Sequence, residues 1–98
     1  MRHVLVIGAG RSASSLIKYL LDHSEKENLH VTIGDLSEDL AKQKTSNHKN
    51  ATAITFDIFN ETQRKAEIQK ADIVVSMLPA HLHLEVAKDC IVYKKHMV

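Results

Sequence analysis

A glycine-rich turn near the start of the chain limits what this sequence can fold into more than any other feature. The unbroken apolar run 4–7 predicts a strand buried on both faces, and Gly8 and Gly10 follow it directly. Apolar residues then recur at helical spacing from Ala13 to Leu21, which predicts a helix of about three turns. A strand, a glycine turn and an amphipathic helix in this order are typical of a parallel α/β fold.

The alternation of strands and helices continues to the end of the chain. Further strands are predicted at 30–34, 53–57 and 73–78, and residues 96–98 predict the start of a fifth. Parallel strands need crossover connections, and these are almost always right-handed. We therefore expect a three-layer α/β/α fold of the Rossmann type with a mostly parallel sheet.

Length and composition allow one small domain. A chain of 98 residues with 44% hydrophobic residues has enough apolar surface for a single modest core. A complete doubly wound nucleotide fold has about six strands, whereas this chain supplies four and the start of another. We therefore expect residues 1–98 to be one Rossmann-type domain, the N-terminal part of a longer protein, with its sheet truncated after the fifth strand begins.

Two of the predicted helices have recognisable starts. Ser37 is a candidate N-cap, and acidic residues follow it at 38–39, where carboxylates suit the helix dipole. Asn60 with Gln63 resembles a capping box and opens a helix that we expect to end near Lys70.

The other connections are less regular. The polar stretch 22–28 predicts a loop between the first helix and the second strand. Pro79 ends the fourth strand, and a last helix follows it. The side of this helix that we expect to be buried carries Leu82, Val86, Ala87, Cys90 and Ile91.

The glycine turn matches the dinucleotide-binding pattern G-x-G-x-x-G/A over residues 8–13. Gly8 permits the tight turn out of the strand, Gly10 lets a pyrophosphate approach the backbone, and Ala13 lets the helix pack closely on the sheet. The helix start offers unpaired N–H groups to phosphates. Arg11 and Ser12 add a positive charge and a hydroxyl at the same place.

A carboxylate at the end of the second strand completes this pattern. Asp35 follows Ala13 by 22 positions and can accept hydrogen bonds from both hydroxyls of the adenosine ribose. It would also repel a 2′-phosphate, and no arginine follows, so we expect NAD rather than NADP. A glycine turn that merely connects strand and helix is disfavoured, because the strand, the helix and the acid coincide.

Two further positions admit two interpretations each. Asp57 closes the third strand, where it would either accept a hydrogen bond from the adenine amino group or cap the turn into the next helix. Leu78 and Pro79 end the fourth strand at the crevice where ligands bind in open α/β sheets. They would either line the pyrophosphate and nicotinamide or simply end the strand.

Several kinds of partner are not expected. A net charge of +1 favours neither nucleic acid nor a membrane surface, and no apolar run approaches the roughly 20 residues of a membrane helix. The single cysteine, Cys90, cannot form an internal disulfide and suits a core position. His81 and His83 would point in nearly opposite directions on a helix, so we expect no metal site. These observations predict a soluble cytoplasmic protein.

The chain resembles the N-terminal domain of saccharopine dehydrogenase-like proteins over nearly its whole length. The glycine turn is generic, whereas the stretch ADIVVSMLPAHLH (71–83) and the closing residues 90–98 are more specific. The resemblance implies an NAD(P)-dependent oxidoreductase that acts on a secondary-amine C–N bond by hydride transfer. It also implies that a small amino-acid-derived substrate and the catalytic groups belong to another domain, so we expect no catalytic residue here.

The residues that the resemblance assigns to the dinucleotide are Gly8, Gly10, Arg11, Ser12, Ala13, Asp35, Asp57, Leu78 and Pro79. NADP-using reductases of this family tend to carry a basic residue after the second strand, where this chain has Asp35 and Leu36, so the expected cofactor is NAD. The alternative is a regulatory NAD-sensing module of a channel or transporter, which also carries a glycine turn and an acid. The oligomeric state stays open, a homo-oligomer included.

Overall fold

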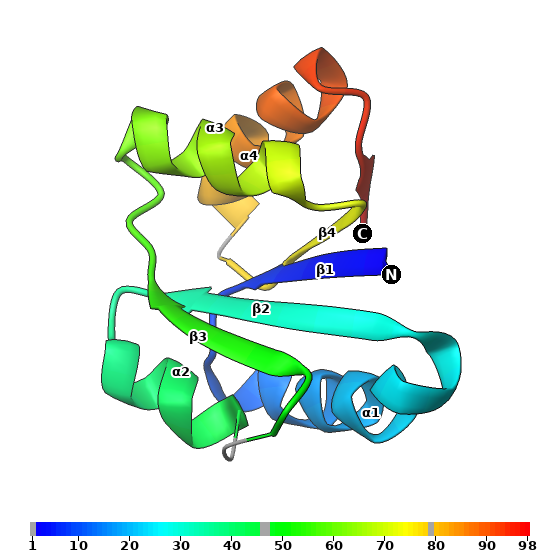
Figure 1. The fold of residues 1–98 in the computed structure, drawn as a ribbon. Coiled ribbons are helices and arrows are strands. Elements are labelled where there is room, and N and C mark those ends of the chain that lie inside the picture. Colours follow the sequence, from blue (N-terminus) through cyan, green and yellow to red (C-terminus); the bar gives the residue numbers. More distant parts are fainter. Residues whose placement is uncertain (1, 46–47, 79) are drawn as a thin grey trace.

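A five-stranded, entirely parallel sheet forms the centre of the computed structural model, which describes residues 2–45, 48–78 and 80–98. The strands are β1 (Arg2–Ile7), β2 (Leu29–Asp35), β3 (Ala51–Thr55), β4 (Ile73–Ser76) and β5 (His96–Met97). Their order in the sheet is β3-β2-β1-β4-β5 (Figure 1). The predicted Rossmann-type fold is confirmed.

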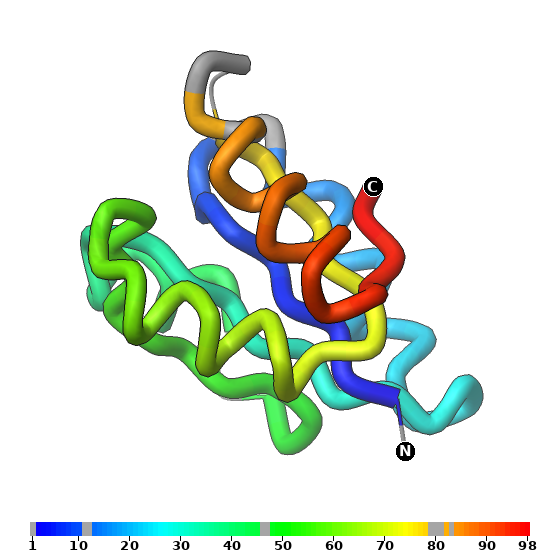
Figure 2. The backbone as a smooth tube through the Cα atoms, turned by 90° about the horizontal axis from the view of Figure 1, so that it is seen from above, coloured from blue at the N-terminus to red at the C-terminus, as the bar shows by residue number. Residues whose placement is uncertain are grey.

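Helices cover both faces of the sheet. On one face lie α1 (Arg11–Glu27) and α2 (Glu38–Thr45), and on the other lie α3 (Glu61–Lys70) and α4 (Ala80–Val92) (Figure 1). Figure 2 shows α3 and α4 side by side across their face of the sheet. The chain runs from β1 to β2 and β3 on one side and returns to β4 on the other. The strand order therefore reverses between β1 and β4, and ligands of open α/β sheets bind at the carboxyl ends of the strands beside such a point.

Alternate residues of the strands fill two cores, one on each face of the sheet. Val4 and Val6 of β1 pack with α1 and α2, whereas Leu5 and Ile7 pack with α3 and α4. All four side chains are buried, because a parallel sheet is covered on both faces. This burial on both faces explains the unbroken apolar run that predicted the first strand.

The first helix is longer than the sequence predicted. Residues 22–28 were expected to form a loop, but α1 continues to Glu27, and Asn28 ends it in the left-handed conformation that asparagine tolerates. Ser24 in this stretch is buried: its hydroxyl donates to the Leu21 carbonyl and accepts from the Asn50 amide. A polar stretch is compatible with a helix when its other faces meet solvent, so polarity alone did not mark the end.

Strand ends differ from the prediction because pairing with neighbouring strands sets them. The third strand was predicted at 53–57 but lies at Ala51–Thr55, where its pairing ends with Thr55 opposite Asp35. The fourth was predicted at 73–78 but ends at Ser76, which pairs with Ile7, the last residue of β1.

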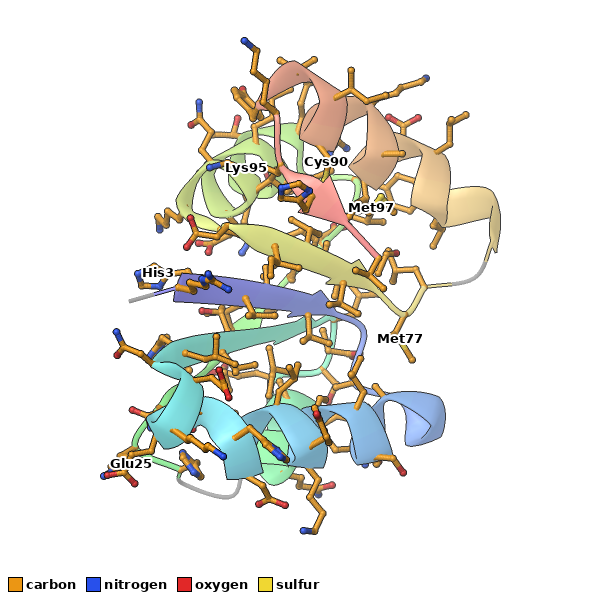
Figure 3. The ribbon with its side chains drawn as sticks, turned by 90° about the vertical axis from the view of Figure 1, so that its right-hand side faces the viewer. His3, Glu25, Met77, Cys90, Lys95 and Met97 are labelled. Atoms are coloured by element: carbon orange, nitrogen blue, oxygen red, sulfur yellow. The ribbon has the colours of Figure 1, made fainter. Side chains whose placement is uncertain are left out.

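The caps and the last helix are partly as predicted. Asn60 caps α3 by accepting from the Gln63 N–H at 3.1 Å, but the Gln63 side chain donates to the Thr55 carbonyl and does not complete a capping box. On α4, Cys90 is buried and points towards the sheet (Figure 3), whereas Ile91 is 78% exposed and not part of the buried side. The helix presents only a narrow side to the sheet.

A methyl group at Gly34 should destabilise the fold, because a Cβ there would lie 2.8 Å from the Cβ of Phe56. The main chain or Phe56 must shift, so we expect Gly34→Ala to lower the free energy of unfolding by about 1–3 kcal/mol in urea denaturation. Gly10→Ser is the control, because a Cβ at Gly10 meets no atom within 4 Å and serine is a good N-cap. Equal urea midpoints for Gly34→Ala and the control would contradict this packing.

Candidate functional site

The turn after β1 is built around Gly8. Its φ of +99° lies in the region that side chains rarely adopt, and a Cβ would lie 3.3 Å from the Met77 carbonyl oxygen. The Gly8 N–H donates to the Gly34 carbonyl at 2.7 Å. Gly8 thus passes closely between β2 and the segment after β4, and it forms the tight turn that the sequence predicted.

Gly10 leaves the start of α1 open. It is the N-cap of α1, with φ −71° and ψ −176°, and the space that a Cβ would occupy is free of other atoms within 4 Å. The glycine has no side chain to cap the helix, and the first turn of α1 carries no acidic residue. The backbone N–H groups there are therefore suited to bind an anion from outside the chain.

The other two helices with described caps differ from α1. Ser37 accepts from the Leu40 N–H at 3.2 Å at the start of α2, and Asn60 caps α3. Acidic residues lie in the first turn of both helices. A side chain of the protein thus caps each of these two helix starts, whereas no side-chain cap closes the start of α1.

Ala13 performs the packing that the pattern requires. It is completely buried in the core between α1 and the sheet, where a larger side chain would push the helix away. Arg11 and Ser12 begin α1, but their side chains lie outside the described part of the structure, and so does Pro79. The roles expected for these three residues stay predictions.

Asp35 is bound to the backbone on two sides. Its Oδ2 accepts from the Ala9 N–H at 2.8 Å, and its Oδ1 accepts from the Ser37 N–H at 2.9 Å. Ala9 is fully buried, so this carboxylate supplies the acceptor for an N–H inside the glycine turn. A carboxylate has about four acceptor positions, and the remaining ones can take ribose hydroxyls. The sequence predicted the ligand contact but not the two backbone bonds.

A pocket of about 130 Å³ lies at the carboxyl ends of the strands, next to this turn. It is smaller than the roughly 300–1,000 Å³ of typical ligand pockets, so it fits one part of a dinucleotide. Its walls come from β1, β2, the segments after β2, β3 and β4, and α4, and they are formed by Ile7, Gly8, Gly34, Asp35, Leu36, Phe56, Asp57, Ile58, Phe59, Leu78 and Leu82.

The predicted residues Gly8, Asp35, Asp57 and Leu78 meet in this pocket. Asp57 also accepts from the Phe59 N–H at 2.9 Å, which is the turn-capping role that the second interpretation assigned to it. The two interpretations of Asp57 are thus compatible, because the carboxylate has acceptor positions left for a ligand.

Leu36 and Phe59 complete the pocket, and sequence reasoning missed both. They are 72% and 73% exposed, although large apolar side chains are usually buried. Both follow the ends of neighbouring parallel strands. Leu36 directly follows Asp35, the last residue of β2, and Phe59 comes two positions after Asp57 in the segment after β3. An apolar residue within two positions of an acid near the end of a strand is the pattern that could have indicated them.

The side chains of His81 and His83, at which no metal site was expected, lie outside the described part of the structure. No group of three metal-binding side chains occurs among the side chains that the structure describes. Within residues 2–45, 48–78 and 80–98, the described part of the chain, no helix combines the length and apolar character needed to cross a bilayer. Burial raises the pKa of the Cys90 thiol, which keeps it protonated and suits the core position predicted for it.

Comparison with known proteins identifies the family. A family model described as the saccharopine dehydrogenase NADP binding domain matches residues 4–98. An α-aminoadipic semialdehyde synthase of Arabidopsis thaliana is 30% identical over 97% of this chain and 10% of its own length. A saccharopine dehydrogenase [NADP(+), L-glutamate-forming] of Pyricularia oryzae is 30% identical over 99% of this chain and 21% of its own length.

A solved structure shares the fold. The apo saccharopine dehydrogenase (L-Glu forming) of Saccharomyces cerevisiae matches with a TM-score of 0.88 and 23% identity, over 99% of this chain and 21% of that one. The chain thus spans about a tenth to a fifth of the relatives it matches.

The family match corrects one expectation and leaves another unfavoured. Asp35 was expected to select NAD over NADP, but the matching domain is described as binding NADP, so only a nicotinamide dinucleotide in general is supported. The alternative of a regulatory module of a channel or transporter is not favoured by relatives of this kind. Because the family model matches residues 4–98, the chain belongs to the saccharopine dehydrogenase NADP-binding domain family.

Proposed function

We propose that the turn between β1 and α1 and the adjoining pocket bind a nicotinamide dinucleotide. The observation that carries this proposal is the open space above Gly10, where the uncapped start of α1 adjoins the pocket that contains Asp35. The pyrophosphate would lie against Gly10 and the N–H groups of α1. Asp35 would hold the adenosine ribose, and the adenine would enter the pocket between Leu36 and Phe59.

The residues of this chain would bind and orient the cofactor. Apolar side chains flank the pocket and exclude water from the adenine, while the Asp57 carboxylate would accept from its amino group. Leu78, at the end of β4, would limit the pocket on the side where the strand order reverses. The bound dinucleotide supplies hydride transfer, and the protein supplies its placement.

The domain would serve an oxidoreductase that acts on a secondary-amine C–N bond. Support comes from the names of the relatives, one of which is a saccharopine dehydrogenase. The chain spans a small part of these relatives, so we propose that residues 1–98 are the cofactor domain of a longer enzyme. An amino-acid-derived substrate would then bind mainly outside this domain.

Titration of the chain with NADPH and NADH tests the binding proposal. We expect saturable binding of at least one of them by calorimetry, with a Kd in the range of about 1 μM to 1 mM, and weaker binding of AMP, which lacks the nicotinamide half. The ratio of the two Kd values measures the cofactor preference. If neither NADPH nor NADH shows saturable binding, the proposed function is overturned.

A further inference from the structure

A buried ion pair joins the two helices on one face of the sheet. Arg64 of α3 is 7% exposed and Asp89 of α4 is 5% exposed, and the Arg64 Nε donates to the Asp89 Oδ2 at 2.5 Å. The carboxylate of Glu85, one turn earlier on α4, lies 3.9 Å from the Arg64 Nη2. The pair connects α3 and α4, which run side by side in Figure 2.

A second bond extends this pair to the candidate site. The Arg64 Nη1 donates to the Ile58 carbonyl at 2.8 Å. Ile58 lies between Asp57 and Phe59 in the segment after β3, and all three line the pocket. Leu82, on the same helix as Asp89, lines the pocket as well. Arg64 therefore links two walls of the pocket, one formed by the segment 57–59 and the other by α4.

Stability alone gives a weak reason for such a pair. Removing two charges from water is costly, and apolar residues of similar volume often stabilise a protein as well or better. The planar guanidinium does provide donors in fixed directions, which apolar residues lack. Here the Arg64 guanidinium sets the position of the Ile58 carbonyl, which belongs to the pocket wall, relative to α4.

We infer that Arg64 is a positioning residue for the adenine end of the site, where it holds the segment 57–59 against α4 through its bonds to Ile58 and Asp89. The inference rests on the proposed function for its ligand. The segment also bonds internally, since the Phe59 N–H donates to the Asp57 carboxylate at 2.9 Å. With Arg64 replaced, we expect this segment to move as a unit away from α4.

The double variant Arg64→Met with Asp89→Leu separates positioning from stability. It replaces the pair by apolar side chains and leaves no buried charge without a partner, so the urea midpoint should fall only by the effect of the lost bond to the Ile58 carbonyl, and the chain should stay folded. Affinity for AMP, measured by calorimetry or NMR titration, should fall about tenfold, as expected for the loss of one ordered contact. Amide exchange of Phe59 and Asn60 should become faster.

Arg64→Lys is the second variant, and it retains the charge. A lysine ammonium lacks the planar fork that reaches Asp89 and Ile58 at once, so we expect a loss of affinity smaller than that of the double variant. Lys65→Met is the matched control. Lys65 lies next in the same helix and forms an exposed pair with Glu61 at 2.6 Å, so this variant should keep the wild-type affinity and amide exchange.

The outcomes are distinguishable. Weaker AMP binding and faster exchange in the double variant, with Lys65→Met unchanged, support the inference. Wild-type affinity in a folded double variant overturns it, even where the wild type binds NADPH or NADH as proposed. If the double variant does not fold, Arg64→Lys decides by the same two measurements. If the wild-type chain binds neither dinucleotide nor AMP, the proposed function fails and the inference with it.

Discussion

Gly10→Val should abolish dinucleotide binding while the chain stays folded. The φ of −71° suits any residue, and a Cβ at this position meets no atom within 4 Å other than those of its chain neighbours, so the fold has room for a side chain here. It would occupy the space above the start of α1 where the pyrophosphate is proposed to lie. We expect the Kd for NADPH and NADH to rise at least ~100-fold, which corresponds to ~2.7 kcal/mol.

Circular dichroism and urea unfolding give the control for this variant. Valine is a poor N-cap, so a loss of stability of up to ~1 kcal/mol is expected, too small to unfold the chain. Gly10→Ala should lie between the wild type and Gly10→Val in affinity, because it adds only one methyl group. Wild-type affinity in Gly10→Val would show that no phosphate lies at this turn.

Asp35→Ala should affect stability and binding together. The variant removes the acceptor of the Ala9 N–H, which is buried, and we expect a loss of about 1.5–3 kcal/mol for this charge-assisted bond. The Ser37 N–H also loses its acceptor but lies at an exposed residue where water can replace it. The glycine turn would loosen, and the Kd for both dinucleotides should rise at least ~10-fold.

Asp35→Asn distinguishes the charge from the hydrogen bonds. Asparagine keeps one acceptor oxygen but no charge, so the loss of stability should be smaller than that of Asp35→Ala. The ratio of the NADPH and NADH affinities of this variant, compared with the ratio for the wild type, measures the effect of the Asp35 charge on a 2′-phosphate. Wild-type unfolding and affinities in Asp35→Ala would exclude Asp35 both from the support of the turn and from ligand contact.

The glycine turn and its acid could be predicted because each residue has a local backbone reason. Gly8 adopts a positive φ, Gly10 leaves open space and Ala13 packs against the sheet, and these demands repeat at fixed spacing wherever the motif occurs. The alternation of apolar and amphipathic stretches likewise predicted the order of the strands and helices.

Features set by distant contacts could not be predicted in this way. The end of β3 at Thr55 lies opposite Asp35, the end of its partner strand, and the Ser24 hydroxyl near the end of α1 bonds to Asn50, which lies 26 positions away in the sequence. The bond between Arg64 and Asp89 joins residues 25 positions apart that show no common pattern in the sequence. Tertiary packing decides such features, and one sequence does not record it.

The two bonds of Asp35 have a consequence for any change of cofactor preference. An arginine close to the end of the second strand is one way to accommodate a 2′-phosphate in this fold. At position 35 an arginine would leave the Ala9 and Ser37 N–H groups without their acceptor, since its side chain has only donors. A residue that contacts a 2′-phosphate would therefore be placed more easily at position 36, because the Leu36 side chain is exposed and takes no part in the two bonds of Asp35.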